Sequence, residues 1–194
     1  VHFSTDYVFN GEKRAPYVEA DIPDPRSIYG KSKLGGEEVL ITSAAEHLIM
    51  RVSWLFGMGA QNFLVKVLGW AARHKELRVS DDEISIPTYT NDVVAYTMLA
   101  LKHNLRGVRH CVNSGRASRF EVARHFLDRM GIKAPLTPVS RDEFKPAAER
   151  PHESCLSNEC LSRELQIVIP DWRDAIDRFV HDHKDELLET YYIH

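Results

Sequence analysis

Cysteine is scarce in this chain, and its few cysteines follow no pattern. The 194 residues include three, Cys111, Cys155 and Cys160. So small and odd a number favours a reducing compartment, and we expect a cytoplasmic protein. Cys155 and Cys160 lack the CxxC spacing of a zinc knuckle. The ten histidines are scattered, and the rings of the closest pair, His181 and His183, would point to different helix faces, so we expect no metal site.

Long apolar runs and a large excess of charge are also missing. The longest uncharged apolar run, residues 52–65, is shorter than a membrane span and is interrupted by polar residues, so we expect no membrane partner. The formal net charge of -3 gives no electrostatic reason to expect nucleic acid as a partner. No signal peptide is recognisable, but this carries little weight, because the chain begins with Val1 rather than Met, as if at the start of a strand.

What the sequence does contain is an alternation of strand and helix patterns. Apolar, β-leaning runs predict buried strands at residues 1–3, 47–57 and 107–115. Helical patterns are found at residues 28–46, 62–74, 92–103, 118–131 and 170–189. This order predicts an α/β fold with a parallel sheet that is covered by helices on both faces. Such sheets bind ligands at the carboxyl ends of their strands, where "STD" and "SW" follow the first two predicted strands.

Short signals predict where several elements begin and end. Ser118 and Glu121 have the spacing of a capping box, and Gly131 would end that helix. Asn91 or Asp92 would cap the preceding helix. After the first strand, residues 7–9 are expected to stay extended before an Asn-Gly turn.

The stretch "SIYGKSKLGGEEVL" places Tyr29 four residues before Lys33. Residues at this spacing share a helix face, so a phenol and an ammonium would lie side by side. A neighbouring cation favours the phenolate, and a phenol tuned in this way can exchange a proton with a carbonyl or hydroxyl oxygen. A hydroxyl at the end of the first strand, Ser4 or Thr5, could orient the same oxygen. The alternative is an ordinary exposed turn of helix, because the spacing is common.

Two glycines follow this pair inside the predicted helix. Gly35 and Gly36 each cost about 1 kcal/mol relative to alanine. We interpret them as a point where another backbone approaches closely, with a weak helix as the alternative.

Six motifs are spread along nearly the whole chain: FSTDYVFNG, PYVEAD, PDPRSIYGKSKLGGEE, MRVSWLFG, RPHESCLSNECL and IPDWRDAI. Together they resemble those of the dTDP-4-dehydrorhamnose reductases, which belong to the extended short-chain dehydrogenase/reductase superfamily. The YxxxK pattern is shared by the entire superfamily. The combination of STDYVF, RxSW and RPxxSxL is much more specific.

The resemblance implies reduction of the 4-keto group of dTDP-4-dehydro-L-rhamnose to dTDP-L-rhamnose, with a hydride from NADPH or NADH. Tyr29 would be the proton donor to the C4 oxygen. Lys33 would lower the pKa of Tyr29 and hold the nicotinamide ribose, while Thr5 would orient the keto group. A dTDP-sugar is therefore the expected partner, and the resemblance leaves a homodimer open.

The same resemblance implies further binding residues. Asp6, beside Thr5, would bind the sugar, and Phe3 would line the cofactor. Trp54 would pack in the substrate pocket, with a role as a core aromatic as the alternative. Arg150 would bind a phosphate of the nucleotide, with a surface salt bridge as the alternative.

For the fold, the resemblance implies the C-terminal part of a Rossmann-type doubly wound sheet, at residues 1–58 and 88–115. A smaller α/β substrate-binding domain with a terminal helix would comprise residues 59–87 and 116–194. The glycine-rich turn that binds pyrophosphate in this family is not found in the chain, and Gly57 and Gly59 fit a loop instead. We therefore expect the C-terminal two thirds of an enzyme, which alone would bind a dinucleotide poorly, would not turn over, and would expose a sheet edge prone to association.

Three alternatives stay open at this point. The first is a non-catalytic regulatory subunit of methionine adenosyltransferase, but that protein favours Ser at the position of Thr5 and lacks Trp54. The second is another nucleotide-sugar reductase or epimerase, because residues 83–86 depart from the family's Gln-x-Gly-type turn. The third is a degenerate fragment that keeps the fold without activity.

Overall fold

A three-stranded parallel sheet lies at the centre of one part of the computed structural model, which describes residues 1–43, 45–144 and 149–192. Its strands are β1 (His2–Thr5), β2 (Leu48–Val52) and β7 (Gly107–His110), in the order β1-β2-β7. In the register, Thr5 lies opposite Val52 and Arg51 lies opposite His110. The carboxyl ends of β1 and β2 therefore meet at the same edge of the sheet, as the sequence predicts.

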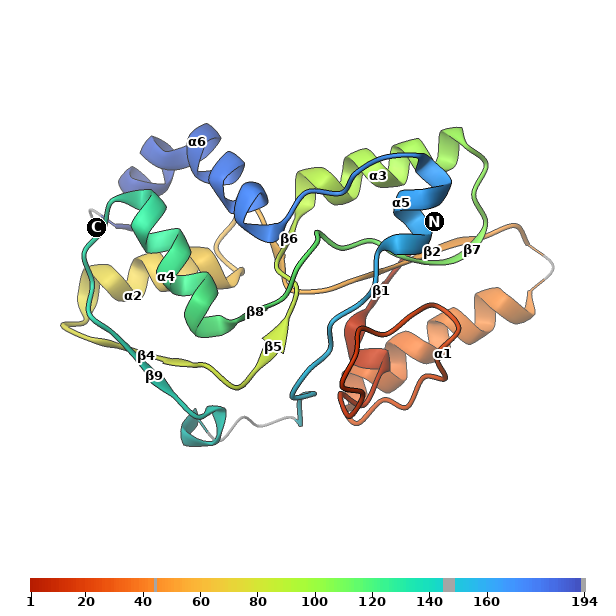
Figure 1. Cartoon of the computed structure of the whole chain (residues 1–194), viewed down its shortest axis with the longest axis horizontal. Coiled ribbons are helices and arrows are strands. Elements are labelled where there is room, and N and C mark those ends of the chain that lie inside the picture. Colours follow the sequence, from red (N-terminus) through yellow and green to blue (C-terminus); the bar gives the residue numbers. More distant parts are fainter. Residues whose placement is uncertain (44, 145–148, 193–194) are drawn as a thin grey trace.

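Helices cover both faces of this sheet. Helix α1 (Ile28–Thr42) lies on one face, and α3 (Thr90–Lys102) and α5 (Glu159–Leu165) lie on the other (Figure 1). Every residue of β2 is buried, as expected for a central strand between two helical layers. The apolar side chains that pack on the α3 and α5 side are Leu48, Met50, Val52, Val93, Ala100, Cys111, Leu161, Leu165 and Ile169. The predicted α/β fold with a parallel sheet covered on both faces is confirmed.

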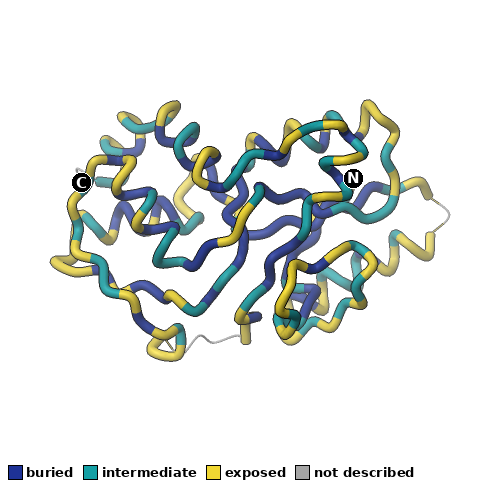
Figure 2. Tube along the Cα trace, in the orientation of Figure 1, coloured by how far each residue is buried: buried dark blue, intermediate teal, exposed yellow. Residues whose placement is uncertain are grey.

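The second part of the molecule is built from three helices and a short sheet. Helices α2 (Phe63–Arg73), α4 (Arg119–Met130) and α6 (Trp172–Tyr191) pack together beside the parallel pair β4 (Leu77–Ser80) and β9 (Leu136–Val139) (Figure 1). Their shared core and the central strands form the dark, buried interior in Figure 2. Within the described residues, none of the helices has the length and apolar character needed to cross a membrane.

Short elements connect the two parts. Strand β3 (Leu55–Phe56) pairs in parallel with β6 (Thr88–Tyr89), and β5 (Ile84–Ser85) pairs antiparallel with β8 (Ala117–Ser118). Two 3-10 turns complete the fold, η1 (Asp6–Val8) directly after β1 and η2 (Arg141–Phe144) after β9. These connections bring the end of β1 close to segments that are far away in the sequence.

The division into two domains stays a prediction, with residues 1–58 and 88–115 in one and residues 59–87 and 116–194 in the other. One observation bears on the boundary. Helix α5 belongs to the second range, yet its side chains Leu161 and Leu165 pack in the same cluster as Leu48 and Met50 of the central sheet. We propose that the segment around α5 returns to the first domain.

Most predicted elements are present, but two stretches have a different backbone. The prediction that residues 7–9 are extended is correct only for Phe9, because the Thr5 hydroxyl accepts a hydrogen bond from the Tyr7 N–H and starts the η1 turn at residues 6–8. The predicted strand over residues 47–57 is interrupted after Val52. Trp54 there adopts a left-handed conformation, with φ 36°, and the chain continues as a separate strand, β3, which pairs with β6 instead of the central sheet.

Two helix boundaries also differ from the prediction. The first helix ends at Thr42 rather than at residue 46, because the next residue, Ser43, has an extended backbone. Tyr89 rather than Asn91 or Asp92 is the N-cap of α3, and it makes no side-chain capping bond. The capping box of Ser118 and Glu121 is confirmed.

Candidate functional site

Tyr29 and Lys33 lie in the first two turns of α1, beside the end of β1. Ser27 caps this helix by accepting a hydrogen bond from the Gly30 N–H at 3.0 Å. The Tyr29 side chain is 54% exposed, and its ring meets the ring of Tyr7 edge to face at 6.2 Å. The Lys33 ammonium donates to the carbonyl oxygen of Phe3 at 2.5 Å. The pair is therefore anchored to β1 through Lys33 and leaves the Tyr29 phenol accessible.

The close approach of α1 to its neighbours occurs at Gly30, a glycine that the sequence analysis did not single out. A Cβ atom at Gly30 would lie 2.2 Å from the carbonyl oxygen of Tyr7, so only glycine fits there. Gly35 has no heavy atom within 4 Å of where its Cβ would be, and Gly36 meets only the ring of His2 at 3.3 Å. The interpretation of Gly35 and Gly36 as a point where another backbone approaches closely is therefore wrong, since Gly35 faces open space and Gly36 meets only a side chain.

Thr5 lies at the junction between β1 and η1 and is buried. Its hydroxyl accepts from the Tyr7 N–H at 3.2 Å and donates to Asp6 Oδ1 at 3.1 Å. A hydroxyl has one proton to donate, so Thr5 must rotate that proton away from Asp6 before it can donate to a keto oxygen. Ser4, the other predicted hydroxyl, is buried, and its oxygen has no partner among the described residues. The orienting role of Thr5 stays a prediction.

The carboxyl group of Asp6 is buried and joins three separate segments. Its Oδ2 atom accepts hydrogen bonds from Ser85 at 3.0 Å and from Ser154 at 2.5 Å. Burial raises the pKa of Asp6 from 3.8 to about 6, although the bonds from Ser154, Ser85 and Thr5 oppose the rise. In this structure the carboxyl therefore links the end of β1 to β5 and to the RPHES segment. The predicted contact between Asp6 and the sugar stays a prediction.

Asp6 gives a pH-dependent contribution to stability that can be measured. The pKa of Asp6 is about 6 in the folded chain, compared with its ordinary value of 3.8. The folded chain therefore binds this proton more tightly than the unfolded chain does, and folding is more favourable when Asp6 is protonated. We expect the stability of the natural chain, relative to Asp6→Asn, to fall by roughly 2 kcal/mol as the pH rises from about 4 to about 7. Urea unfolding of both proteins across this range tests the expectation, and parallel stability curves would contradict it.

Trp54 is strained and lies between the two parts of the molecule. A left-handed backbone is unusual for a bulky residue and costs on the order of 1–3 kcal/mol. Trp54 is half-buried against the apolar core that α2, α4 and α6 share. Its ring faces the guanidinium of Arg119, whose central carbon is 3.5 Å from the ring centroid. Strain of this kind persists where surrounding contacts impose it, and it is frequent at functional sites.

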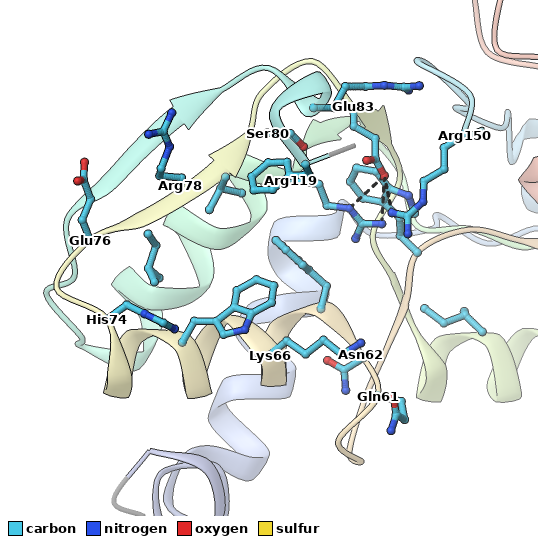
Figure 3. Close-up of a pocket in the computed structure, with 18 residues that line it drawn as sticks. Gln61, Asn62, Lys66, His74, Glu76, Arg78, Ser80, Glu83, Arg119 and Arg150 are labelled. Carbon is cyan, nitrogen blue, oxygen red and sulfur yellow. Dashed lines mark hydrogen bonds and ion pairs between the residues drawn. The ribbon is translucent and has the colours of Figure 1, made fainter. Parts of the chain in front are cut away.

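Trp54 lines a cavity of about 850 Å³. Figure 3 shows the side chains around this cavity, with Arg119, Arg150 and Glu83 close together in its wall. Its aromatic lining is Trp54, Phe63, Trp70 and Phe144. Its charged lining is Lys66, Arg78, Arg119, Arg141, Arg150, Glu76 and Glu83, an excess of three positive charges. The volume is within the range of small-molecule sites, and the lining suits a ligand that has both an aromatic ring and negative charge.

Of the predicted site residues, Trp54 and Arg150 line this cavity, whereas Thr5, Tyr29 and Lys33 lie at the end of β1. The Tyr7 ring contacts that of Tyr29, and the charges of Glu83, Arg119 and Arg150 act on the Tyr7 phenol. Burial raises the pKa of Tyr7 to about 12, and the negative charges of Asp6 and Glu83 add to the rise. The sequence pattern indicates no role for Tyr7 or Arg119, although Tyr7 is part of the STDYVF motif.

Among the described residues, no group of three or more His, Cys, Asp or Glu side chains is arranged to hold a metal ion. Tyr29, Lys33 and Phe3 offer a different kind of site. Phe3 on β1 is 44% exposed and its carbonyl oxygen is bonded to Lys33, and Tyr29 is 54% exposed, so an aromatic ring, a phenol and an ammonium come from two neighbouring elements. These groups fit the nicotinamide and ribose of a dinucleotide.

Comparisons with known proteins agree on one family. The model for the RmlD substrate binding domain matches residues 1–184. The spore coat polysaccharide biosynthesis protein SpsK of Bacillus subtilis is 38% identical over 182 residues, which cover 94% of this chain and 64% of that protein. The dTDP-4-dehydrorhamnose reductase of Escherichia coli is 32% identical over 193 residues, with 94% and 64% covered.

A solved structure gives the same answer for the fold. The crystal structure of dTDP-4-dehydrorhamnose reductase from Bacillus anthracis, in complex with NADP, superposes with a TM-score of 0.90 at 32% identity. The match covers 93% of this chain and 64% of that one. The chain thus spans slightly less than two thirds of the length of these relatives.

Proposed function

Because this chain belongs to the family of RmlD substrate-binding domains, we propose that it is the catalytic and substrate-binding part of a dTDP-4-dehydrorhamnose reductase. The protein would reduce the 4-keto group of dTDP-4-dehydro-L-rhamnose to give dTDP-L-rhamnose. The observation that carries this proposal is the exposed Tyr29, one helical turn before Lys33 on α1, whose ammonium is held at β1. The cationic aromatic cavity lined by Trp54 and Arg150 would receive the nucleotide.

The proton chemistry would depend on three side chains. A carbonyl that accepts a hydride develops negative charge on its oxygen, and a positioned acid with nearby donors stabilises that charge. Tyr29 would give its proton to the C4 oxygen. Lys33 would favour the resulting phenolate through its positive charge, and Thr5 would orient the keto group once its hydroxyl turns from Asp6.

The cofactor we propose is NADPH or NADH, which supplies the hydride when bound. Phe3, Tyr29 and Lys33 would contact its nicotinamide riboside end, since Phe3 and Tyr29 are exposed and Lys33 is bonded to the Phe3 carbonyl oxygen. The presence of NADP in the Bacillus anthracis reductase supports this choice. The expectation that this chain alone would bind the cofactor poorly stays a prediction.

The dTDP part of the substrate would occupy the cavity beside Trp54. Its aromatic lining suits the thymine ring, and its excess of positive charge suits the diphosphate. Arg150, with its side chain 46% exposed, lies 3.8 Å from Glu83 and would contact a phosphate. A homodimer stays a prediction, and the three unpaired cysteines support a cytoplasmic location.

Trp54 gives a direct test of substrate placement. We expect Trp54→Ala to raise the KM for the nucleotide sugar on the order of tenfold, because stacking on an aromatic base contributes about 1–3 kcal/mol. Trp54→Phe is the matched control, since it keeps an aromatic face. Steady-state kinetics and thermal unfolding should be measured together. An unaltered KM with a lower Tm would contradict the substrate-binding role and show that Trp54 contributes only to packing.

The reaction itself is tested by NADPH oxidation with the full-length protein. We expect turnover with dTDP-4-dehydro-L-rhamnose, and much slower turnover with the UDP-linked keto sugar and with 4-keto sugars of other configuration. Faster reduction of another dTDP-linked keto sugar would keep the reaction class and change the substrate. A folded protein that binds NADPH and reduces none of them would favour the non-catalytic alternative.

A further inference from the structure

Arg119 occupies an unusual position in the wall of the cavity. It is the first residue of α4, and its side chain is only 17% exposed. Its guanidinium carbon is 3.5 Å from the ring centroid of Trp54 and 4.8 Å from that of Phe63. The aromatic rings provide cation–π contacts to the guanidinium, and its N–H groups need polar partners.

The polar partner of Arg119 within the chain is loosely bound. Arg119 Nε and Nη2 approach the same oxygen of Glu83 at 3.4 and 3.5 Å, the outer limit of a hydrogen bond. Arg150 Nη1 lies 3.8 Å from that same oxygen, so one carboxylate serves two guanidinium groups (Figure 3). The cluster formed by Glu83, Arg119 and Arg150 therefore has an excess positive charge.

Arg51, a buried arginine on β2, makes a bidentate ion pair with Glu37 and serves as a comparison for Arg119. Arg51 reaches both carboxylate oxygens of Glu37, and its shortest contact is 2.6 Å. Burial lowers the pKa of Arg119 while the negative charge of Glu83 opposes the change, as expected for a cation with incomplete compensation. A ligand with two negative charges would neutralise the positive charge of Arg119 and Arg150 and would accept hydrogen bonds from both guanidinium groups.

We propose that Arg119 is a substrate-binding residue that holds the diphosphate of the nucleotide sugar together with Arg150. Glu83 is their counterion and keeps the two guanidinium groups in position until the diphosphate takes its place. This inference rests on the proposed function, because it takes a dTDP-sugar as the ligand. It adds a binding role for Arg119 and explains why an acidic residue at position 83 lies in a cavity for an anion.

Isothermal titration calorimetry of the full-length protein with thymidine and with dTDP tests this role. Arg119→Gln should weaken dTDP binding roughly 10- to 100-fold, the range for hydrogen bonds to charged groups, and leave thymidine binding unchanged. Arg119→Lys should recover part of the loss, because it restores the charge. Glu83→Gln should tighten dTDP binding, since the amide keeps an oxygen for Arg119 and no longer competes with the diphosphate.

The control is Arg124→Gln, which removes the same charge from the exposed side of the same helix. It should leave both affinities unchanged. Equal weakening of thymidine and dTDP by Arg119→Gln would overturn the proposal and make Arg119 a purely structural residue, and so would unchanged binding of dTDP. If the natural protein bound thymidine and dTDP equally well, or bound neither, the proposed substrate class would fail as well.

Discussion

Replacing Tyr29 by Phe is expected to reduce the kcat of the full-length protein by roughly 100- to 10,000-fold, the range that a positioned acid contributes. The substitution removes only the phenolic oxygen. The ring is 54% exposed and touches Tyr7 edge to face, so neither packing nor the anchoring of Lys33 to β1 should change. The affinity for dTDP should therefore stay the same, because the cavity beside Trp54 is unaltered.

Tyr96→Phe is the matched control for this experiment. Tyr96 is a partly buried residue on α3 that packs against the core of the central sheet. The change removes the same atom at a distance from the candidate site, and we expect full activity. If Tyr29→Phe turned over at the natural rate, Tyr29 would not be the proton donor, whatever the substrate.

Replacing Glu37 by Ala is expected to lower the free energy of unfolding by about 3–5 kcal/mol. The side chain of Glu37 is fully buried on α1, and that of its partner Arg51 on β2 is 4% exposed. Removing the carboxylate would leave the Arg51 guanidinium charged, buried and without its counterion. Urea unfolding followed by circular dichroism measures the loss.

Two further variants show whether burial of the charge is the cause. The double variant Glu37→Leu with Arg51→Met removes both charges and should recover most of the stability. Glu46→Ala breaks an exposed pair with Arg106 and should change stability very little. A loss in Glu37→Ala as small as that in Glu46→Ala would contradict this account of how α1, and with it Tyr29, is fixed to the sheet.

The parts of the structure that depend on neighbouring residues could be predicted from the sequence. Ser118 and Glu121 are three residues apart, and both capping bonds are present. Tyr29 and Lys33 are one helical turn apart and share α1, as the spacing requires. The parallel sheet follows from the order of its elements, and the family inferred from the motifs is confirmed over residues 1–184.

The contacts that shape the candidate site join residues far apart in the chain, and no local pattern reveals them. Asp6 meets Ser154, which is 148 residues away, and Arg119 meets Trp54 across 65 positions. The role of Gly30 depends equally on a carbonyl group of another segment. Arginine side chains are mostly exposed on protein surfaces, so the sequence gives no sign that Arg119 packs against Trp54 and Phe63.

Transfer of deuterium is the measurement that tests the central claim most directly. The full-length protein would be given dTDP-4-dehydro-L-rhamnose and NADPH that has deuterium at the transferable position of its nicotinamide ring. We predict that dTDP-L-rhamnose forms with deuterium at C4, and that the Tyr29→Phe protein forms almost none. Deuterium at any other carbon, or oxidation of NADPH without reduction of the sugar, would contradict the assignment of this chain as the catalytic part of a 4-ketoreductase.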